Sequence, residues 1–279
     1  MTMTDFLRAA ASGIIQGLTE FLPVSSSGHL ALFVNMFGFD VDGEFLLFAL
    51  ILHLGTLLAV FIAFARDIKE LFAAFFTLMA KIFTRRFKWA GLEVYERFVI
   101  LVFIATLPLV IGAFLEGAVS AVAYNSRVIG ALLLVNAVIL LLCDRIKTRD
   151  VTAETAAPKN ALLVGLIQLV AVFPGISRSG MTITGGLLNG FTREFAVKFS
   201  FILSIPAILG ASVFHLADFM REGEAITREL ASNVIIGFLF SFVFGFAAII
   251  MLRLIARKRR FWIFAVWCAI VGTLAVIFG

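Results

Sequence analysis

The sequence predicts an all-α integral membrane protein built as an inverted-topology repeat, each half containing one re-entrant helical hairpin and three transmembrane helices. Composition, a set of long apolar stretches and an internal repeat lead to this prediction. Hydrophobic residues make up 62% of the 279 positions and charged residues only 15%, and the mean hydropathy is +1.08. A soluble domain is about 45–50% apolar and about 25% charged. We therefore expect residues 1–279 to form a single membrane domain.

Several apolar stretches are long enough to cross a bilayer as helices, which takes roughly 20 residues. A transmembrane β-barrel would instead show short segments of alternating hydrophobicity. Because the sequence has long unbroken apolar runs, helices are predicted. The predicted spans are residues 45–64, 98–115, 128–143, 195–216, 234–252 and 261–278.

Two polar, glycine- and serine-rich segments resemble each other and stand out in this apolar chain. They match without gaps at an offset of 152 positions, the separation of Gln16 from Gln168. The repeat indicates that residues 1–150 and 151–279 are two related halves. Under this offset Gly13, Ile15, Gln16, Phe21, Ser25, Ser27 and Gly28 coincide with Gly165, Ile167, Gln168, Phe173, Ser177, Ser179 and Gly180.

Basic residues indicate the orientation in the membrane. The chain has 23 Lys+Arg against 18 Asp+Glu, but the bases sit in short loops between apolar segments, so no nucleic-acid partner is expected. The positive-inside rule places such clusters in the cytoplasm. Tracing the spans from them puts both termini and the loops 117–126 and 218–231 outside. The basic clusters are residues 81–97, 145–159 and 253–260.

The two polar segments, residues 5–39 and 160–189, must each begin and end on one side of the membrane. Each has a helix breaker at mid-length, Pro23 in the first and Pro174 with Gly175 in the second. Irregular backbone at membrane depth is tolerated where protein or water satisfies its polar groups. Both segments are therefore predicted to be re-entrant hairpins, the first entering from outside and the second from inside.

Because each hairpin is followed by three spans, an odd number, the second half must lie upside down relative to the first. The functional site of such an inverted repeat is expected where the two hairpin tips meet. Residues 68–83 are interpreted as an interfacial helix, since a seventh span there would destroy this topology.

The residues around the two breaks suggest phosphate chemistry. Gln16 and Glu20 share a helix face, and an ionisable group at membrane depth marks function by default. A serine after Pro23 can cap a new helix, with His29 one turn on. Helix N-termini bind phosphate, as does the guanidinium fork of Arg178. A hydroxyl, an imidazole, a carboxylate and an arginine together are what phosphoryl transfer requires.

Other polar residues of the apolar segments receive structural interpretations. His53 and His215 are expected to be structural, and Asn136 and Asn189 to make interhelical hydrogen bonds. Cys143 and Cys268 lack the spacing of a metal site or disulfide framework and are expected to pack in the interior.

At these residues the chain resembles a known family, the undecaprenyl-diphosphate phosphatases, which are bacitracin-resistance membrane proteins of bacteria. The resemblance is carried by the segment from Gln16 to His29 and by that from Pro174 to Thr182, and it extends to the segments 53–60 and 199–206. Many members have glutamate where this chain has Gln16. That difference weakens the case for two carboxylates jointly binding a metal.

The resemblance implies removal of the terminal phosphate from undecaprenyl diphosphate, which regenerates the lipid carrier of peptidoglycan synthesis. It also implies promotion by Mg²⁺ or Ca²⁺, a multi-pass location in the bacterial inner membrane and a site open to the periplasm. Both termini are then periplasmic. The partners are the polyprenyl diphosphate substrate and membrane lipids; the oligomeric state, including a homodimer, stays open.

The expected mechanism has Ser26 attacking the terminal phosphorus while His29 takes its proton. Arg178 and the two helix N-termini hold the phosphates, and Glu20 with Gln16 orients a divalent cation or a water. Attack by water activated by His29 or Glu20 is the alternative. The expected further phosphate contacts are Ser25, Ser27, Ser177, Ser179, Thr182, Gly28 and Gly175.

A transporter or flippase for a lipid phosphate or an anion is the main rival interpretation, since inverted repeats with broken helices are typical of transporters. Such a protein would need a polar pathway, whereas here the polar residues cluster at the two tips and the spans are nearly bare. A scaffold role would leave Glu20 and Arg178 at membrane depth unexplained. The enzyme is therefore preferred.

Overall fold

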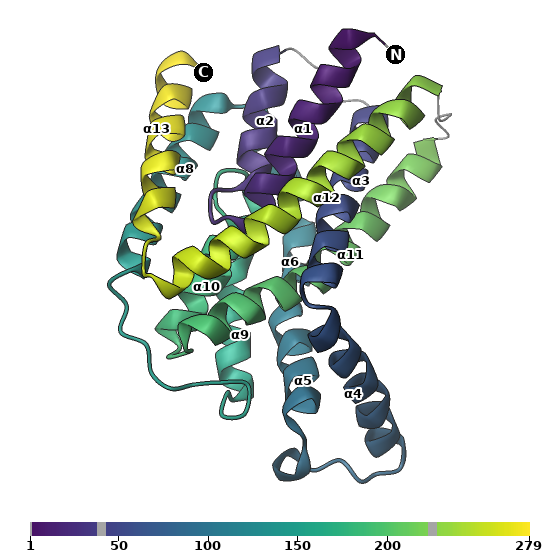
Figure 1. Ribbon diagram of the computed structural model, residues 1–279, viewed down its shortest axis with the longest axis vertical. Helices are drawn as coiled ribbons and strands as arrows, with labels where there is room; N and C mark the ends of the chain where they lie inside the picture. The colour runs from purple at the N-terminus through teal and green to yellow at the C-terminus, as the bar shows by residue number, and fades with distance from the viewer. Residues whose placement is uncertain (1, 38–42, 223–227) are drawn as a thin grey trace.

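The computed structural model describes residues 2–37, 43–222 and 228–279 (Figure 1). In these ranges the regular structure is helical, and the one extended pairing is an isolated bridge between Val151 and Phe191. The predicted all-α class is therefore confirmed. The helices are α1 Met3–Phe21, α2 Ser26–Phe37, α3 Gly43–Ala63, α4 Ala65–Phe83, α5 Val94–Thr106, α6 Leu109–Gly112, α7 Glu116–Ala123, α8 Ser126–Cys143, α9 Pro158–Leu169, α10 Arg178–Leu188, α11 Arg193–Glu222, α12 Arg228–Arg257 and α13 Trp262–Phe278, with 3-10 turns η1 Trp89–Gly91, η2 Ala113–Leu115 and η3 Val170–Val172.

The protein is a multi-pass membrane protein. Among the described residues, 4 helices are long and apolar enough to cross a membrane, or up to 5 if one bent pair counts as a single span. Helix α13 is apolar but shorter, at 17 residues. The 4 candidate spans correspond to the predicted spans 98–115, 128–143, 195–216 and 234–252; they are Val94–Gly112, Ser126–Cys143, Arg193–Val213 and Ala231–Arg257.

Two details of the predicted element boundaries need correction. The span predicted over residues 98–115 runs from Val94 to Gly112, with a turn after Thr106, where Pro108 lacks a backbone donor and separates α5 from α6. The region 117–126, expected to be a loop, contains helix α7. Residues 38–39 of the first predicted hairpin and 223–227 of the predicted outer loop lie outside the described residues.

The bent pair consists of α3 and α4, which meet at Phe64 at an angle of 89°. Helix α4 is amphipathic: it buries Ala74 and Leu78 and exposes Phe72 and Phe76. Residues 68–83 are thus helical and turned away from the preceding span. Such a helix, apolar on one exposed face and bordered by charge, is suited to the membrane–water interface.

The two predicted hairpins correspond to broken helices. Helix α1 ends at Phe21 and α2 begins at Ser26; α9 and η3 end at Val172, and α10 begins at Arg178. The starts of α2 and α10 are thus related by the offset that separates Gln16 from Gln168. In Figure 1 both ends of the chain lie at the top, α1 and α2 run from that end to the centre, and α9 approaches the centre from below.

Tight helix packing positions these breaks. Helix α1 lies along α12, α13 lies along α8, and α3 lies between α11 and α12. Ring contacts fix α5 against α11: Phe98 stacks on Phe199 and meets Phe195 edge to face. Cys143 and Cys268 are unpaired and buried, as expected for packing residues. The breaks are therefore held at fixed positions in the middle of the bundle.

Candidate active site

The first break is a tight turn that ends in a serine cap. Ser25 has φ +73°, in the left-handed region that non-glycine residues rarely adopt. Its Oγ accepts a hydrogen bond from the backbone N–H of Gly28 at 3.3 Å, which caps α2. The unusual backbone of Ser25 thus turns the chain back on itself and directs the start of α2 toward the centre of the protein.

The second break has the same local pattern. Ser177 Oγ accepts a hydrogen bond from the backbone N–H of Gly180 at 3.1 Å and caps α10. Gly175 supplies the turn with φ +107°, and a Cβ there would lie 2.7 Å from the Cβ of Leu132. A side chain at this position would therefore be both strained and obstructed.

The two breaks touch each other directly. The backbone N–H of Gly175 donates to Ser25 Oγ at 3.0 Å, and Ser179 Oγ donates to the carbonyl of Leu22 at 3.2 Å. A Cβ at Gly28 would lie 2.8 Å from the Gly175 nitrogen. The predicted meeting of the two tips is thus observed as hydrogen bonds between the serine side chains of each break and the backbone of the other.

Asn136 on α8 fastens both breaks from the side. Its Nδ2 donates to the carbonyl of Pro23 at 2.9 Å, and its Oδ1 accepts from the backbone N–H of Ser177 at 3.1 Å. The side chain is 0% exposed, so both bonds are shielded from water. The expected interhelical role of Asn136 takes the form of a clamp between the tips.

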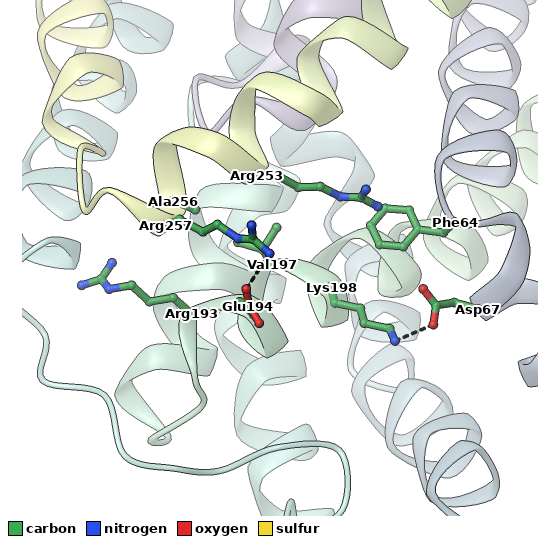
Figure 2. Close-up of a pocket in the computed structure, with 9 residues that line it drawn as sticks. All are labelled: Phe64, Asp67, Arg193, Glu194, Val197, Lys198, Arg253, Ala256 and Arg257. Carbon is green, nitrogen blue, oxygen red and sulfur yellow. Dashed lines mark hydrogen bonds and ion pairs between the residues drawn. The ribbon is translucent and has the colours of Figure 1, made fainter.

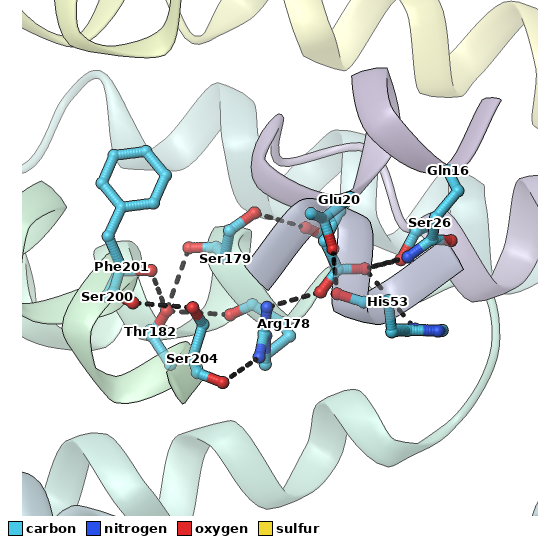
Figure 3. Close-up of polar contacts among 12 residues, drawn as sticks. Gln16, Glu20, Ser26, His53, Arg178, Ser179, Thr182, Ser200, Phe201 and Ser204 are labelled. Atoms are coloured by element: carbon cyan, nitrogen blue, oxygen red, sulfur yellow. Dashed lines mark hydrogen bonds and ion pairs between the residues drawn. The ribbon is translucent and has the colours of Figure 1, made fainter. Parts of the chain in front are cut away.

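Glu20 is the centre of the polar cluster in Figure 3, and it is only 7% exposed. Its Oε2 accepts hydrogen bonds from Gln16 Nε2 at 2.9 Å and from Ser26 Oγ at 2.6 Å. Its Oε1 accepts from Arg178 Nη2 at 2.6 Å. Ser26 and Arg178 are the first residues of α2 and α10. The two breaks therefore bring a hydroxyl and a guanidinium to one carboxylate.

Arg178 is held on its other side by α11. Its Nη1 donates to the carbonyl of Ser204 at 3.4 Å. Thr182, one turn along α10, lies 2.6 Å from Ser200 Oγ and donates to the Arg178 carbonyl at 2.9 Å. Thr182 is therefore occupied by protein contacts and supports the start of α10 rather than facing Glu20 (Figure 3).

His29 does not occupy the place expected for it. Its Nδ1 lies 2.8 Å from the carbonyl of Ser25, and Trp267 Nε1 donates to its Nε2 at 2.9 Å. Nδ1 thus carries the hydrogen, and both ring nitrogens are occupied. No hydrogen bond joins His29 to Ser26, although both are described residues; the Ser26 hydroxyl donates to Glu20 instead.

His53 was assigned a structural role from the sequence, yet it lies beside Glu20. Its Nε2 is 3.7 Å from Glu20 Oε2, and its Nδ1 lies 2.8 Å from the carbonyl of Ala49. An ionisable residue inside an apolar span is a signal of function, and that signal could have identified His53. The side chain of His215 lies outside the described part of the structure.

Most of the serines expected to contact phosphate are used in holding the breaks. The hydroxyls of Ser25, Ser177 and Ser179 bond within or between the tips. Ser27 is exposed and lies 3.5 Å from Ser25 Oγ. Among the predicted phosphate contacts and the residues around Glu20, Ser27 is exposed, and Ser26, Arg178 and His53 are partly exposed.

Gln16 and Glu20 fit a cation that binds together with a phosphate. Gln16 Oε1 is buried without a hydrogen-bond partner, while Nε2 of the same amide donates to the Glu20 carboxylate. Mg²⁺ and Ca²⁺ prefer oxygen ligands, and Mg²⁺ is commonly held by one or two carboxylates plus substrate phosphates. No group of three or more His, Cys, Asp or Glu suited to a metal occurs among the described residues. The protein would therefore supply few of the ion's ligands.

The fold and the site together define a helical, multi-pass membrane protein with a polar centre assembled from two helix breaks. The chain belongs to the family described as Bacitracin resistance protein BacA, which it matches over residues 9–274.

Similar proteins extend over nearly the whole chain. A protein of Methanobrevibacter smithii is 41% identical over 271 residues, covering 96% of this chain and 95% of the relative. One of Alkaliphilus metalliredigens is 38% identical over 281 residues, covering 99% of each. A third, of Methanosphaera stadtmanae, is 36% identical over 285 residues, covering 99% of this chain and 98% of the relative. All three are named undecaprenyl-diphosphatase.

Proposed function

We propose that this protein is an integral membrane phosphatase that hydrolyses undecaprenyl diphosphate to undecaprenyl phosphate and inorganic phosphate. It thereby recycles the lipid carrier for peptidoglycan synthesis and confers bacitracin resistance. Family membership and the names of its relatives support the substrate. The observation that carries the chemistry is the convergence of Ser26 and Arg178 on Glu20.

In the proposed mechanism Ser26 Oγ attacks the terminal phosphorus and its proton passes to Glu20, the acceptor 2.6 Å away. The bond from this phosphorus to the bridging oxygen breaks, and undecaprenyl phosphate leaves with the electron pair. Water then attacks the phosphoserine, releasing inorganic phosphate and restoring the hydroxyl. Arg178 and the N–H groups at the start of α2 and α10 stabilise the charge on the phosphate oxygens.

Direct attack by water is the alternative within the same site. Here Glu20 deprotonates the water and Ser26 only positions the phosphate. The geometry of Glu20 supports it as the base in either mechanism, because His29 is occupied on both ring nitrogens by Ser25 and Trp267.

A divalent cation, Mg²⁺ or Ca²⁺, is proposed as the cofactor. Gln16 Oε1 and Glu20 would hold it together with phosphate oxygens. When bound, the ion supplies positive charge that polarises the phosphoryl oxygens. Gln16 has a second task in this proposal, since its Nε2 orients the Glu20 carboxylate.

The proposed topology is an inverted repeat of residues 1–150 and 151–279, in the bacterial inner membrane. Each half has a re-entrant hairpin, with spans as predicted from the sequence. The common offset of the two breaks and the location of both chain ends at one end of the bundle support it (Figure 1). The positive-inside rule then makes both termini periplasmic, and a site open to the periplasm follows from the family. Cysteine labelling from outside should reach position 125 but not 86 or 258; the reverse pattern would contradict the orientation.

Phosphate release by the purified protein in detergent tests the activity, because transport cannot be scored there. We expect phosphate release from undecaprenyl diphosphate with Mg²⁺ or Ca²⁺. If no phosphate is released with any cation tried, the phosphatase activity is contradicted.

Rapid-quench experiments with labelled terminal phosphate should trap a phosphoserine. Ser26→Ala should lower the rate by on the order of 10³-fold or more, since the nucleophile is lost. No trapped label together with a near-normal Ser26→Ala rate would exclude Ser26 as nucleophile.

A further inference from the structure

A second polar pocket lies at the α3–α4 break and shares no residue with the Glu20 cluster. Figure 2 shows side chains from α4, the first turns of α11 and the last turns of α12 gathered around it. Its volume is about 280 Å³. The residues that line it are Phe64, Asp67, Arg193, Glu194, Val197, Lys198, Arg253, Ala256 and Arg257.

Both acidic residues of this pocket are already paired. Lys198 Nζ lies 2.5 Å from Asp67 Oδ1, and Arg257 Nη2 lies 2.7 Å from Glu194 Oε1. Arg253 pairs with no carboxylate among the described residues. The four bases that line the pocket therefore outnumber its two acids.

Arg253 is held in a fixed orientation. Its guanidinium carbon lies 4.0 Å from the ring centre of Phe64, a cation–π contact. Its Nη2 donates to the carbonyl of Ala63 at 3.2 Å. The other guanidinium N–H groups have no acceptor within the described ranges and remain for a ligand. A partly buried cation without a directly paired carboxylate is costly, so a bound anion would offset that cost.

The position of the pocket suggests where such an anion comes from. It opens at the first turn of α4, whose Phe72 and Phe76 are exposed and which we place at the membrane interface. Lipid phosphates lie at that depth. Guanidinium binds phosphate through two parallel hydrogen bonds. A volume of about 280 Å³ is at the lower limit of drug-sized sites, which suits a phosphate headgroup and excludes a whole lipid.

We propose that this pocket binds a phosphate group through Arg253, either as part of a lipid headgroup or as free inorganic phosphate. The site is separate from the proposed catalytic centre. Asp67 holds Lys198 beside the pocket.

Calorimetric titration of the full-length protein in detergent tests the proposal. The probes are dihexanoyl phosphatidylglycerol, sodium phosphate and, as a phosphate-free control, dihexanoylglycerol. We expect a binding event that Arg253→Gln weakens roughly 10- to 100-fold, because charge-assisted hydrogen bonds are lost. Arg260→Gln, which removes the same charge from an exposed neighbour in the same basic segment, should leave it unchanged. Binding of the lipid alone identifies a headgroup site, and binding of both phosphate probes identifies a site for the phosphate group itself.

Three outcomes would overturn the proposal. The first is equal affinity of the wild type and Arg253→Gln for the phosphate probes. The others are binding of dihexanoylglycerol with the same dependence on Arg253, and no binding of either phosphate probe. Thermal unfolding without ligand checks that the variants are folded. Should Arg253→Gln fail to fold, Arg253→Lys gives the same test: it keeps the charge but loses the fork, and its affinity should still fall. These results do not depend on phosphate release, so the proposed function can fail independently.

Discussion

The two helix breaks share one hydrogen-bonded frame but present different side chains to the centre of the protein. Ser25 caps α2 at Gly28, and Ser177 caps α10 at Gly180. The next residue is Ser26 in the first break and arginine in the second, and both contact Glu20. One position in the frame holds one side chain. Two breaks are therefore needed to place a hydroxyl and a guanidinium on the same carboxylate.

The helices before the breaks differ in a second way. Gln16 bonds to Glu20 one turn later, but Gln168 has Val172 at that place. Both amide atoms of Gln168 are buried without a partner, and the residue is 1% exposed. An unsatisfied buried polar group costs about 1–3 kcal/mol. The second half thus retains the glutamine of the repeat without the carboxylate that satisfies it.

The largest expected effect on catalysis distinguishes Glu20 from its counterpart Val172. Glu20→Ala should lower kcat/KM for phosphate release by on the order of 10³-fold, because Ser26 loses its proton acceptor and Arg178 its anion. Val172→Ala, the matched control, should stay within about threefold of wild type, since it removes no contact to Ser26 or Arg178. Similar losses in both variants would mean that packing, not the carboxylate, explains the effect.

A smaller effect, on stability rather than on rate, is expected at Asn136, which joins the two breaks. Asn136→Ala leaves the Pro23 carbonyl and the Ser177 N–H buried and unsatisfied, which should lower the free energy of unfolding by about 2–4 kcal/mol. Asn189→Ala serves as control because Asn189 Nδ2 donates within its own helix, to Gly185; it should cost less than about 1 kcal/mol. Denaturant titration in micelles measures both. An Asn136→Ala variant as stable as the control would show that the clamp is dispensable.

The smallest expected effects, on stability and on kcat/KM, distinguish Gln168 from Gln16. Gln168→Leu should leave activity unchanged and raise the unfolding free energy by up to about 1 kcal/mol, because it removes two unsatisfied polar atoms. Gln16→Leu should lower kcat/KM by about tenfold, since Glu20 loses a hydrogen bond. Rates and melting curves of the two variants give the comparison. Destabilisation by Gln168→Leu would indicate a partner for Gln168, such as a buried water.

Local sequence signals predicted much of the site. The breaks at Pro23 and at Pro174 with Gly175 follow from the chemistry of these residues, and the common helix face of Gln16 and Glu20 follows from their spacing. The serine caps are equally local. These features depend on neighbours within one or two turns, so they could be inferred without the fold.

Residues whose roles depend on distant partners were predicted less well. His53 approaches Glu20 only because α3 packs beside α1. His29 was paired with nearby Ser26, but packing of α13 brings Trp267 to its ring instead. The clamp role of Asn136 also required knowing that α8 passes both breaks.

The sequence by itself determined that the chain is helical, lies in a membrane and is interrupted at two related polar segments. Composition, apolar run length and the two polar breaks are signals carried by neighbouring residues, although only the packed structure shows which prolines interrupt a helix, since Pro206 lies inside α11. Tertiary structure decided which atoms meet: that Ser26 gives its hydrogen to Glu20 rather than to His29, and that Arg178 completes the site from the other half. Such pairings depend on the relative placement of whole helices, which is fixed by close packing across the bundle and leaves no mark in the spacing of residues along the chain.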